Sequence, residues 1–202
     1  MARPKIKRQA TAVDMTAMCD VSFLLLNFFV MTSTAIVPDP VDIKIPSSTY
    51  KIKVPDTDLS ILTLGKEGQV FYETIGQDIK IATLEKMGEQ YNIEFTPEEK
   101  KRFSVIAGFG VPIQSLKQYI ALDTDGRKKS GLNVGIPTDS TNNQLSSWLL
   151  NSRKAVAELH STPMRVSIKG EQSQPYPQFK KIVDILQDQK INKFSLVTTS
   201  EG

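Results

Sequence analysis

One apolar stretch near the N-terminus limits what this chain can fold into more than any other feature. It covers residues 13–37, and from Val21 to Val37 it contains no formally charged residue. A helix over this range is long enough to cross the hydrocarbon core of a bilayer, which is about 30 Å thick. The stretch therefore predicts a transmembrane helix, and the rest of the chain is long enough for one domain of ordinary size.

A line of polar residues follows one side of this predicted helix. Asp20, Asn27 and Thr34 are seven residues apart and lie nearly above one another, and Thr16 precedes Asp20 by one turn. We call these four residues the polar seam. An ionised carboxylate in a bilayer core costs about 3 kcal/mol or more, so we expect the seam to face another helix or a water-filled path where Asp20 exchanges a proton. The alternative is that the seam only joins helices by hydrogen bonds.

The sequence of residues 13–32, VDMTAMCDVSFLLLNFFVMT, resembles the N-terminal helix of the ExbD/TolR family. The family pattern is a polar residue, Thr, often Pro, then Asp-Val, a leucine-rich stretch and a Phe-Met-Val-Thr end. Ala17 stands where the family often has Pro, whereas the Asp-Val pair is kept as Asp20-Val21. The resemblance implies that Asp20 is the family's essential membrane aspartate. Asp14, six residues earlier and about 120° away around the helix, is interpreted as an interfacial residue.

The charge distribution predicts the orientation of the chain in the membrane. Residues 1–12 form a tail with no acidic residue, and its basic residues are Arg3, Lys5, Lys7 and Arg8. By the positive-inside rule this tail lies in the cytoplasm, so residues 38–202 lie outside it, which for the family means the periplasm of a cell with an inner membrane. The rest of the chain is almost neutral, so its composition does not indicate nucleic-acid binding.

A cleaved signal peptide is the rival interpretation of the N-terminus. A basic start, an apolar core and small residues at Ser33 and Ala35 fit that pattern. Asp20 and Asn27 interrupt the apolar core, however, and the core is longer than the 7–15 residues that a signal peptide needs. We therefore expect the helix to remain as a membrane anchor.

A proline-rich linker is expected between the membrane and the domain, over residues 38–58. Pro38 and Pro40 end the helix, because proline cannot continue its hydrogen bonding. The following segment alternates apolar and charged residues and resembles an acidic-aliphatic-Pro segment of the family. By that resemblance four residues are candidates for binding a partner: Asp42, Ile43, Ile45 and Pro46. The alternative is a plain tether.

The expected domain, residues 59–202, begins and ends with strand patterns. Residues 59–64 and 69–74 flank a glycine-containing turn and predict a hairpin. The C-terminal part predicts a helix ending near His160, a strand at 164–168, a loop at 170–174, a helix at 176–189 and a strand at 194–198. This last part resembles the family's C-terminal strand-helix-strand unit. The pattern predicts an α+β two-layer domain with helices on a small mixed sheet, and the resemblance implies a homodimer.

The region of about 76–137 is the main departure from the family. Helices are predicted at 79–91, from Pro97 onward and at 115–122, and an exposed loop is predicted from Asp123 to Pro137. Thr96 and Glu99 form the pattern of a capping box. We expect this insertion to fold, to pack two or three helices outside the sheet and to enlarge a surface for a partner. A stabilising lid without a partner is the alternative.

The sequence offers little for enzymatic chemistry. His160 is the single histidine and Cys19, the single cysteine, lies in the membrane stretch, so a zinc site is not expected. We interpret His160 as a helix cap or surface residue. No nucleotide-binding motif is present, and residues 123–134 do not fit a calcium loop. We therefore expect no cofactor, no metal and no enzymatic activity.

Without an ATP site, the proton gradient is the expected energy source. The resemblance implies a subunit of an inner-membrane motor in which Asp20 carries protons, ExbB-like channel subunits surround the membrane helix, and a TonB-like protein passes the motion to outer-membrane transport. Lipid surrounds the rest of the helix. A TolR-like role in envelope integrity is the alternative within the family. An anchored periplasmic binding module without a motor role is the alternative outside it.

Overall fold

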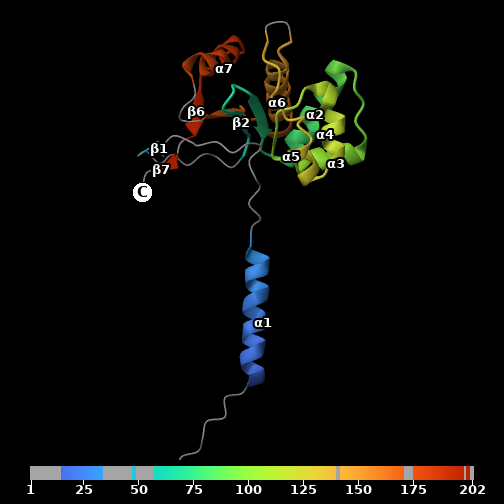
Figure 1. The fold of residues 1–202 in the computed structure, drawn as a ribbon, viewed down its shortest axis with the longest axis vertical. Helices are drawn as coiled ribbons and strands as arrows, with labels where there is room; N and C mark the ends of the chain where they lie inside the picture. The colour runs from blue at the N-terminus through green and yellow to red at the C-terminus, as the bar shows by residue number, and fades with distance from the viewer. Residues whose placement is uncertain are drawn as a thin grey trace, which may run out of the picture. The chain divides into compact units, whose positions relative to one another are not determined.

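The computed structural model describes residues 15–33, 57–139, 142–170 and 175–197, together with the backbone of residues 47–48 and 199–200. The chain separates into two compact units, residues 1–37 and residues 38–202, and each is described by itself. The first unit contains the helix α1, and the second contains a sheet with its covering helices (Figure 1).

The helix α1 spans Met15–Thr32, which is about 27 Å at 1.5 Å per residue. It is the one helix of the described residues that is long and apolar enough to cross a membrane. The predicted transmembrane helix is confirmed over this range. The positions of the predicted span at 13–14 and 34–37 lie outside the described residues.

The second unit is built on a five-stranded mixed sheet with the strand order β4-β3-β2-β5-β6. The β2–β3 and β3–β4 pairs are antiparallel, and the β2–β5 and β5–β6 pairs are parallel. The strands are β2 (Leu59–Leu64), β3 (Val70–Thr74), β4 (Gly108–Phe109), β5 (Arg165–Gly170) and β6 (Phe194–Val197). The predicted hairpin is thus confirmed as β2 and β3, and β5 and β6 confirm the two later strands. Of the loop predicted at 170–174, Gly170 is the last residue of β5, and residues 171–174 lie outside the described residues.

Helices cover one face of this sheet. They include α2 (Gln77–Tyr91), α6 (Gln144–His160) and α7 (Tyr176–Asp188). The chain moves in the same direction across the sheet from β2 to β5 and from β5 to β6, and both pairs of strands are parallel. Because crossovers between parallel strands are right-handed, α6 and α7 lie on the same face of the sheet. Buried residues of α6 and α7 accordingly belong to one core cluster with those of β2 and β5. The α+β two-layer prediction is confirmed.

The core centres on Trp148 of α6, which is fully buried. Its ring lies 4.8 Å from the ring of Phe109 and 6.1 Å from that of Phe103, measured between centroids, and 6.3 Å from that of Tyr72. Aromatic pairs at such distances add about 0.5–1.5 kcal/mol each to the burial of their area. Phe103 and Phe109 belong to the insertion, and Tyr72 belongs to the hairpin, so both regions share one core.

The insertion contributes α2, α3 (Pro97–Ser104), β4, a 3-10 turn at Ile113–Ser115, α4 (Leu116–Ala121) and α5 (Thr124–Lys129). The prediction that it lies outside the sheet is wrong, because β4 pairs with β3, and Ile136 N–H donates to the carbonyl of Val70 at 2.8 Å. The insertion therefore completes one edge of the sheet. Its apolar residues enter the same core as those of β2, β5 and α7.

Local signals correctly placed most helices of the insertion. The capping box is present, since Glu99 N–H donates to Thr96 Oγ1 and Thr96 N–H donates to Glu99 Oε2 at 2.8 Å. The loop predicted from Asp123 to Pro137 is partly wrong, because Asp123 caps α5 by accepting from Gly126 N–H at 2.9 Å. The cap and the basic residues of its last turn favour this short helix.

The linker region contains a short strand. The backbone of β1 (Ser47–Ser48) pairs in parallel with that of β7 (Thr199–Ser200), near the C-terminal end of the chain. The four candidate residues Asp42, Ile43, Ile45 and Pro46 lie outside the described residues, as do Pro38 and Pro40. Their predicted role in binding a partner is therefore untested.

Candidate functional site

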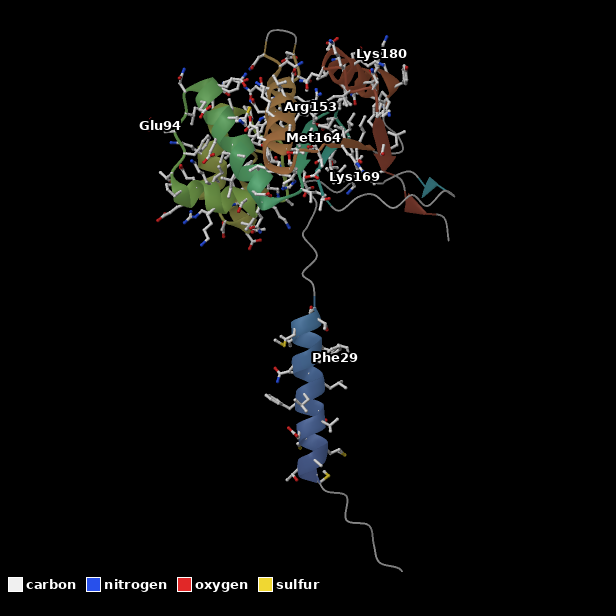
Figure 2. The ribbon with its side chains drawn as sticks, turned by 180° about the vertical axis from the view of Figure 1, so that it is seen from behind. Phe29, Glu94, Arg153, Met164, Lys169 and Lys180 are labelled. Carbon is white, nitrogen blue, oxygen red and sulfur yellow. The ribbon has the colours of Figure 1, made fainter. Side chains whose placement is uncertain are left out.

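The helix α1 brings two residues of the polar seam onto one side. Asp20 and Asn27 lie within about 20° of each other around the axis, and Thr16 lies about 40° from Asp20. Thr34 lies outside the described residues. No side chain of α1 is buried within the chain, and Figure 2 shows these side chains, Phe29 among them, radiating from the helix. Asp20 is the only ionisable residue in α1 apart from Cys19.

Hydrogen bonding distinguishes Asp20 and Asn27 from the hydroxyl residues of the same helix. Ser22 Oγ–H donates to the Met18 carbonyl at 2.8 Å, and Thr32 Oγ1–H donates to the Phe28 carbonyl at 2.7 Å. Those two hydroxyls are satisfied by their own helix. Among the described residues, no group forms a hydrogen bond or ion pair with the side chain of Asp20 or Asn27. In a bilayer these two groups require a partner from another molecule or water.

A second polar constellation lies where the chain enters the α+β domain. His160, the last residue of α6, hydrogen-bonds through Nδ1 to Asp58 Oδ1 and through Nε2 to Asp78 Oδ2 at 2.9 Å. Asp58 directly precedes β2, and Asp78 is in the first turn of α2. Thr162 Oγ1–H donates to the other oxygen of Asp58 at 3.0 Å. We call His160, Asp58, Asp78 and Thr162 the histidine junction. It fixes the residue before β2 to two helices.

The histidine junction shifts the pKa values of its ionisable members. Hydrogen bonds to Asp58 and Asp78 raise the pKa of His160 above its ordinary value of 6.5. The hydrogen bond to His160 lowers the pKa of Asp58 below 3.8, with a smaller contribution from the charge of Arg165. Burial raises the pKa of Asp78, but the hydrogen bonds from its own helix and from His160 outweigh burial and leave it lowered. The junction therefore favours a charged imidazolium between two carboxylates.

Sequence reasoning missed this constellation. The interpretation of His160 as a helix-terminal residue is correct for its position, but the two carboxylates come from residues far away in the sequence. Asp58 was assigned to the linker and Asp78 to the start of the insertion, so no local spacing connects them. Only the packing of α2 against α6 brings the three residues together.

A small cavity adjoins the aromatic core. It measures about 10 Å³, about enough for one water molecule. Trp148 and Thr83 are among its lining residues, and the Nε1 of Trp148 and the Oγ1 of Thr83 are buried without a hydrogen-bond partner among the described residues. Lys80 lies at its edge, where its Nζ donates to the Ile106 carbonyl at 2.6 Å, and burial lowers its pKa. The cavity is too small for a substrate or cofactor.

Comparison with known proteins places the chain in a family. The family model described as biopolymer transport protein ExbD/TolR matches residues 7–201. No curated protein and no solved structure matches the chain. The match includes the helix with Asp20, the insertion and the whole α+β domain. With one spanning helix and this domain, the chain belongs to the ExbD/TolR family of membrane proteins that energise biopolymer transport.

Proposed function

We propose that the chain is the proton-motive-force transducing subunit of an ExbB-ExbD-TonB-type inner-membrane motor, with Asp20 as its proton carrier. One observation carries the proposal: α1 holds a single carboxylate, Asp20, on the same side as Asn27, and the described part of the chain provides neither with a partner. Membership in the family supports a role in energising transport. The partner that α1 requires is then an ExbB-like set of channel helices.

Protonation of Asp20 couples ion flow to movement by a physical cycle. The charged carboxylate is favoured next to water and the neutral acid is favoured among apolar side chains. The carboxylate must therefore reach a water-filled path on one side of the membrane and then a second path on the other side. The helix moves as the proton passes between them. The membrane potential provides about 2.3 kcal/mol per charge for each 100 mV, which is enough to bias such a cycle.

The α+β domain transmits this movement in the proposed mechanism. The linker enters the five-stranded sheet at Asp58, which the histidine junction holds to α2 and α6, so force along the linker is passed to both helices there. We place the N-terminal tail in the cytoplasm and the domain in the periplasm, where a TonB-like protein receives the motion and the domain forms a homodimer. An intact N-terminus in mass spectrometry supports this placement. A mature chain beginning at Ile36 contradicts it.

Substitution of Asp20 by Asn tests the proton-carrying role. Asp20→Asn removes the exchangeable carboxylate with little change in size, so the protein is expected to insert and assemble but to lose all gradient-driven transport. Asp14→Asn is the matched control, because it makes the same chemical change six residues earlier, off the face of Asp20. Uptake is measured in cells whose native subunit is deleted. Full uptake with Asp20→Asn would exclude the proposal and favour an anchored binding module.

The TolR-like role is the second candidate, because the family description covers both branches. Both roles use the membrane carboxylate, so Asp20→Asn does not separate them. Measuring two phenotypes in the deletion strain does: loss of energised uptake supports the ExbD-like role, whereas detergent sensitivity and leakage of periplasmic proteins with normal uptake supports the TolR-like role.

A further inference from the structure

A basic groove lies on the α+β domain beside the histidine junction, since its lining residue Thr162 donates a hydrogen bond to Asp58. It has a volume of about 600 Å³ and is bounded by the outer face of α6, the α6–β5 turn and the connection from α7 to β6. On α6 the lining residues Leu150, Arg153, Lys154 and Ala157 follow helical spacing, so they form one continuous face. Figure 2 shows Arg153 and Met164, two of the lining residues, close together.

The opposite wall of the groove is held in place by the backbone. Lys190 adopts a left-handed conformation with φ of 60° after the end of α7. The next residue, Ile191, donates its N–H to the Leu186 carbonyl at 2.8 Å. Arg153 Nη1–H donates across to the Gln189 carbonyl at 2.9 Å and so ties α6 to this wall. The groove is therefore a formed feature of the domain.

All the charged side chains that line the groove are cations. They are Arg153 and Lys154 on one wall and Lys190 and Lys193 on the other. In the part of the chain that the structure describes, no acidic side chain pairs with these lysines. Glu158, the nearest acid on α6, is instead bound to Lys86 of α2 at 2.8 Å. Four positive charges are thus left to attract an anionic partner.

The floor between these charges is apolar. Leu150 is 43% exposed although it is a large aliphatic residue, and Pro163 and Met164 continue the surface above the buried Ile191. An extended peptide directs alternate side chains to one face, so its aliphatic side chains can lie on the floor while the flexible acidic side chains between them reach the cations at the rims. A lipid headgroup would instead need cations that converge on one point. These cations are distributed along two walls.

We propose that this groove binds an acidic peptide segment, rich in aliphatic residues, of a partner protein. The proposal goes beyond the motor role and does not depend on Asp20, because binding needs no proton gradient. Rim charges contribute mostly to attraction and selectivity, so binding is expected to weaken as salt concentration rises.

The test uses the full chain in nanodiscs of zwitterionic lipid and a fluorescein-labelled peptide in which Glu alternates with Leu. Fluorescence anisotropy is expected to show saturable binding, and a peptide with Lys in place of Glu is expected not to bind. Lys154→Glu combined with Lys190→Glu reverses one charge on each wall and is expected to weaken binding at least tenfold. Lys180→Glu combined with Lys181→Glu is the matched control, since both lysines are exposed on α7 outside the groove.

Three outcomes would overturn the proposal. The first is no binding of the acidic peptide at low salt, and the second is equal weakening by the groove and control pairs. The third is binding of vesicles of anionic lipid that the groove pair abolishes while peptide binding persists, which would assign the groove to lipid. Leu150→Ser tests the floor without changing charge, and it is expected to weaken peptide binding while thermal unfolding is unchanged.

Discussion

The membrane helix and the α+β domain differ in where their polar side chains find hydrogen-bond partners. In α1 no residue is buried within the chain, and the side chains of Asp20 and Asn27 lack partners among the described residues. In the domain, polar groups are buried with partners from distant elements: Tyr72 donates to Ser152 Oγ at 2.7 Å and lies 2.9 Å from Ser60 Oγ. The domain completes its own structure, whereas the helix depends on other molecules.

This difference separates the determinants of function from those of stability. A change on the polar seam of α1 removes a contact with a partner and should alter activity without unfolding the domain. A change in the domain core removes internal contacts and should alter stability first. The four predictions below test this separation, beginning with the largest expected effect.

Deleting residues 76–137 and joining the ends by a short linker is expected to unfold the domain. The deletion removes β4 and α2 together with Phe103 and Phe109 of the main core. Replacing only α5 by a linker of similar length is the control, because α5 has no buried residue. Circular dichroism and limited proteolysis of the membrane-inserted chain measure both. A folded domain after the large deletion would show that the insertion is a separate unit.

Trp148→Ala is expected to lower the free energy of unfolding by about 3–5 kcal/mol, because it leaves a cavity where four aromatic rings meet. A loss of this size approaches the total stability of many domains. Trp148→Phe is the control and should cost less, since the indole N–H has no partner among the described residues. Chemical unfolding followed by circular dichroism measures the difference, and equal losses for the two variants would contradict the packing argument.

Asn27→Leu is expected to weaken gradient-driven transport without abolishing it. One hydrogen bond between membrane helices is worth about 0.6–2 kcal/mol, and Asn27 lies on the face of Asp20. Ser22→Ala is the control and should leave transport unchanged, because the Ser22 hydroxyl bonds only within its own helix. Stability of the domain should be the same in both variants. A larger loss from Ser22→Ala than from Asn27→Leu would refute the assignment of the partner-facing side.

His160→Gln is expected to make the domain less stable in a restricted pH range. Because the folded state raises the pKa of His160, its contribution is complete below pH 6.5 and is lost as the pH rises through the folded value. Asp58 and Asp78 have lowered pKa values, so they remain ionised until the pH falls below about 3.8. The stability difference between variant and parent should therefore be largest between these limits and shrink in alkali.

The pH dependence of unfolding by urea measures this effect, with Trp148 fluorescence as the signal because it is the only tryptophan of the chain. Asp58→Asn serves as the companion variant and should reduce the pH-dependent difference, because the hydrogen bond to Asp58 is the larger of the two that raise the pKa of His160 and the one to Asp78 remains. A difference that is constant from pH 5 to pH 9 would mean that His160 contributes by packing or neutral hydrogen bonding alone.

Elements with strong local signals were predictable from the sequence. The apolar run gave α1, the alternation around a glycine turn gave the β2–β3 hairpin, and the Thr96–Glu99 capping box gave the start of α3. The helix α5 was missed because its glycine and lysines are typical of loops. The strand β4 was missed because two residues, one of them glycine, carry almost no strand signal.

The sequence alone determined that an apolar helix carries one carboxylate, and the order of its motifs identified the family. These are properties of residues close together in the chain, where helical spacing converts sequence separation directly into position. Tertiary structure alone decided that the insertion belongs to the core and that His160 meets Asp58 and Asp78. It also decided that four cations from two walls share one groove. Such contacts join residues brought together by the packing of α2, α6 and α7 on the sheet, and no local spacing encodes them.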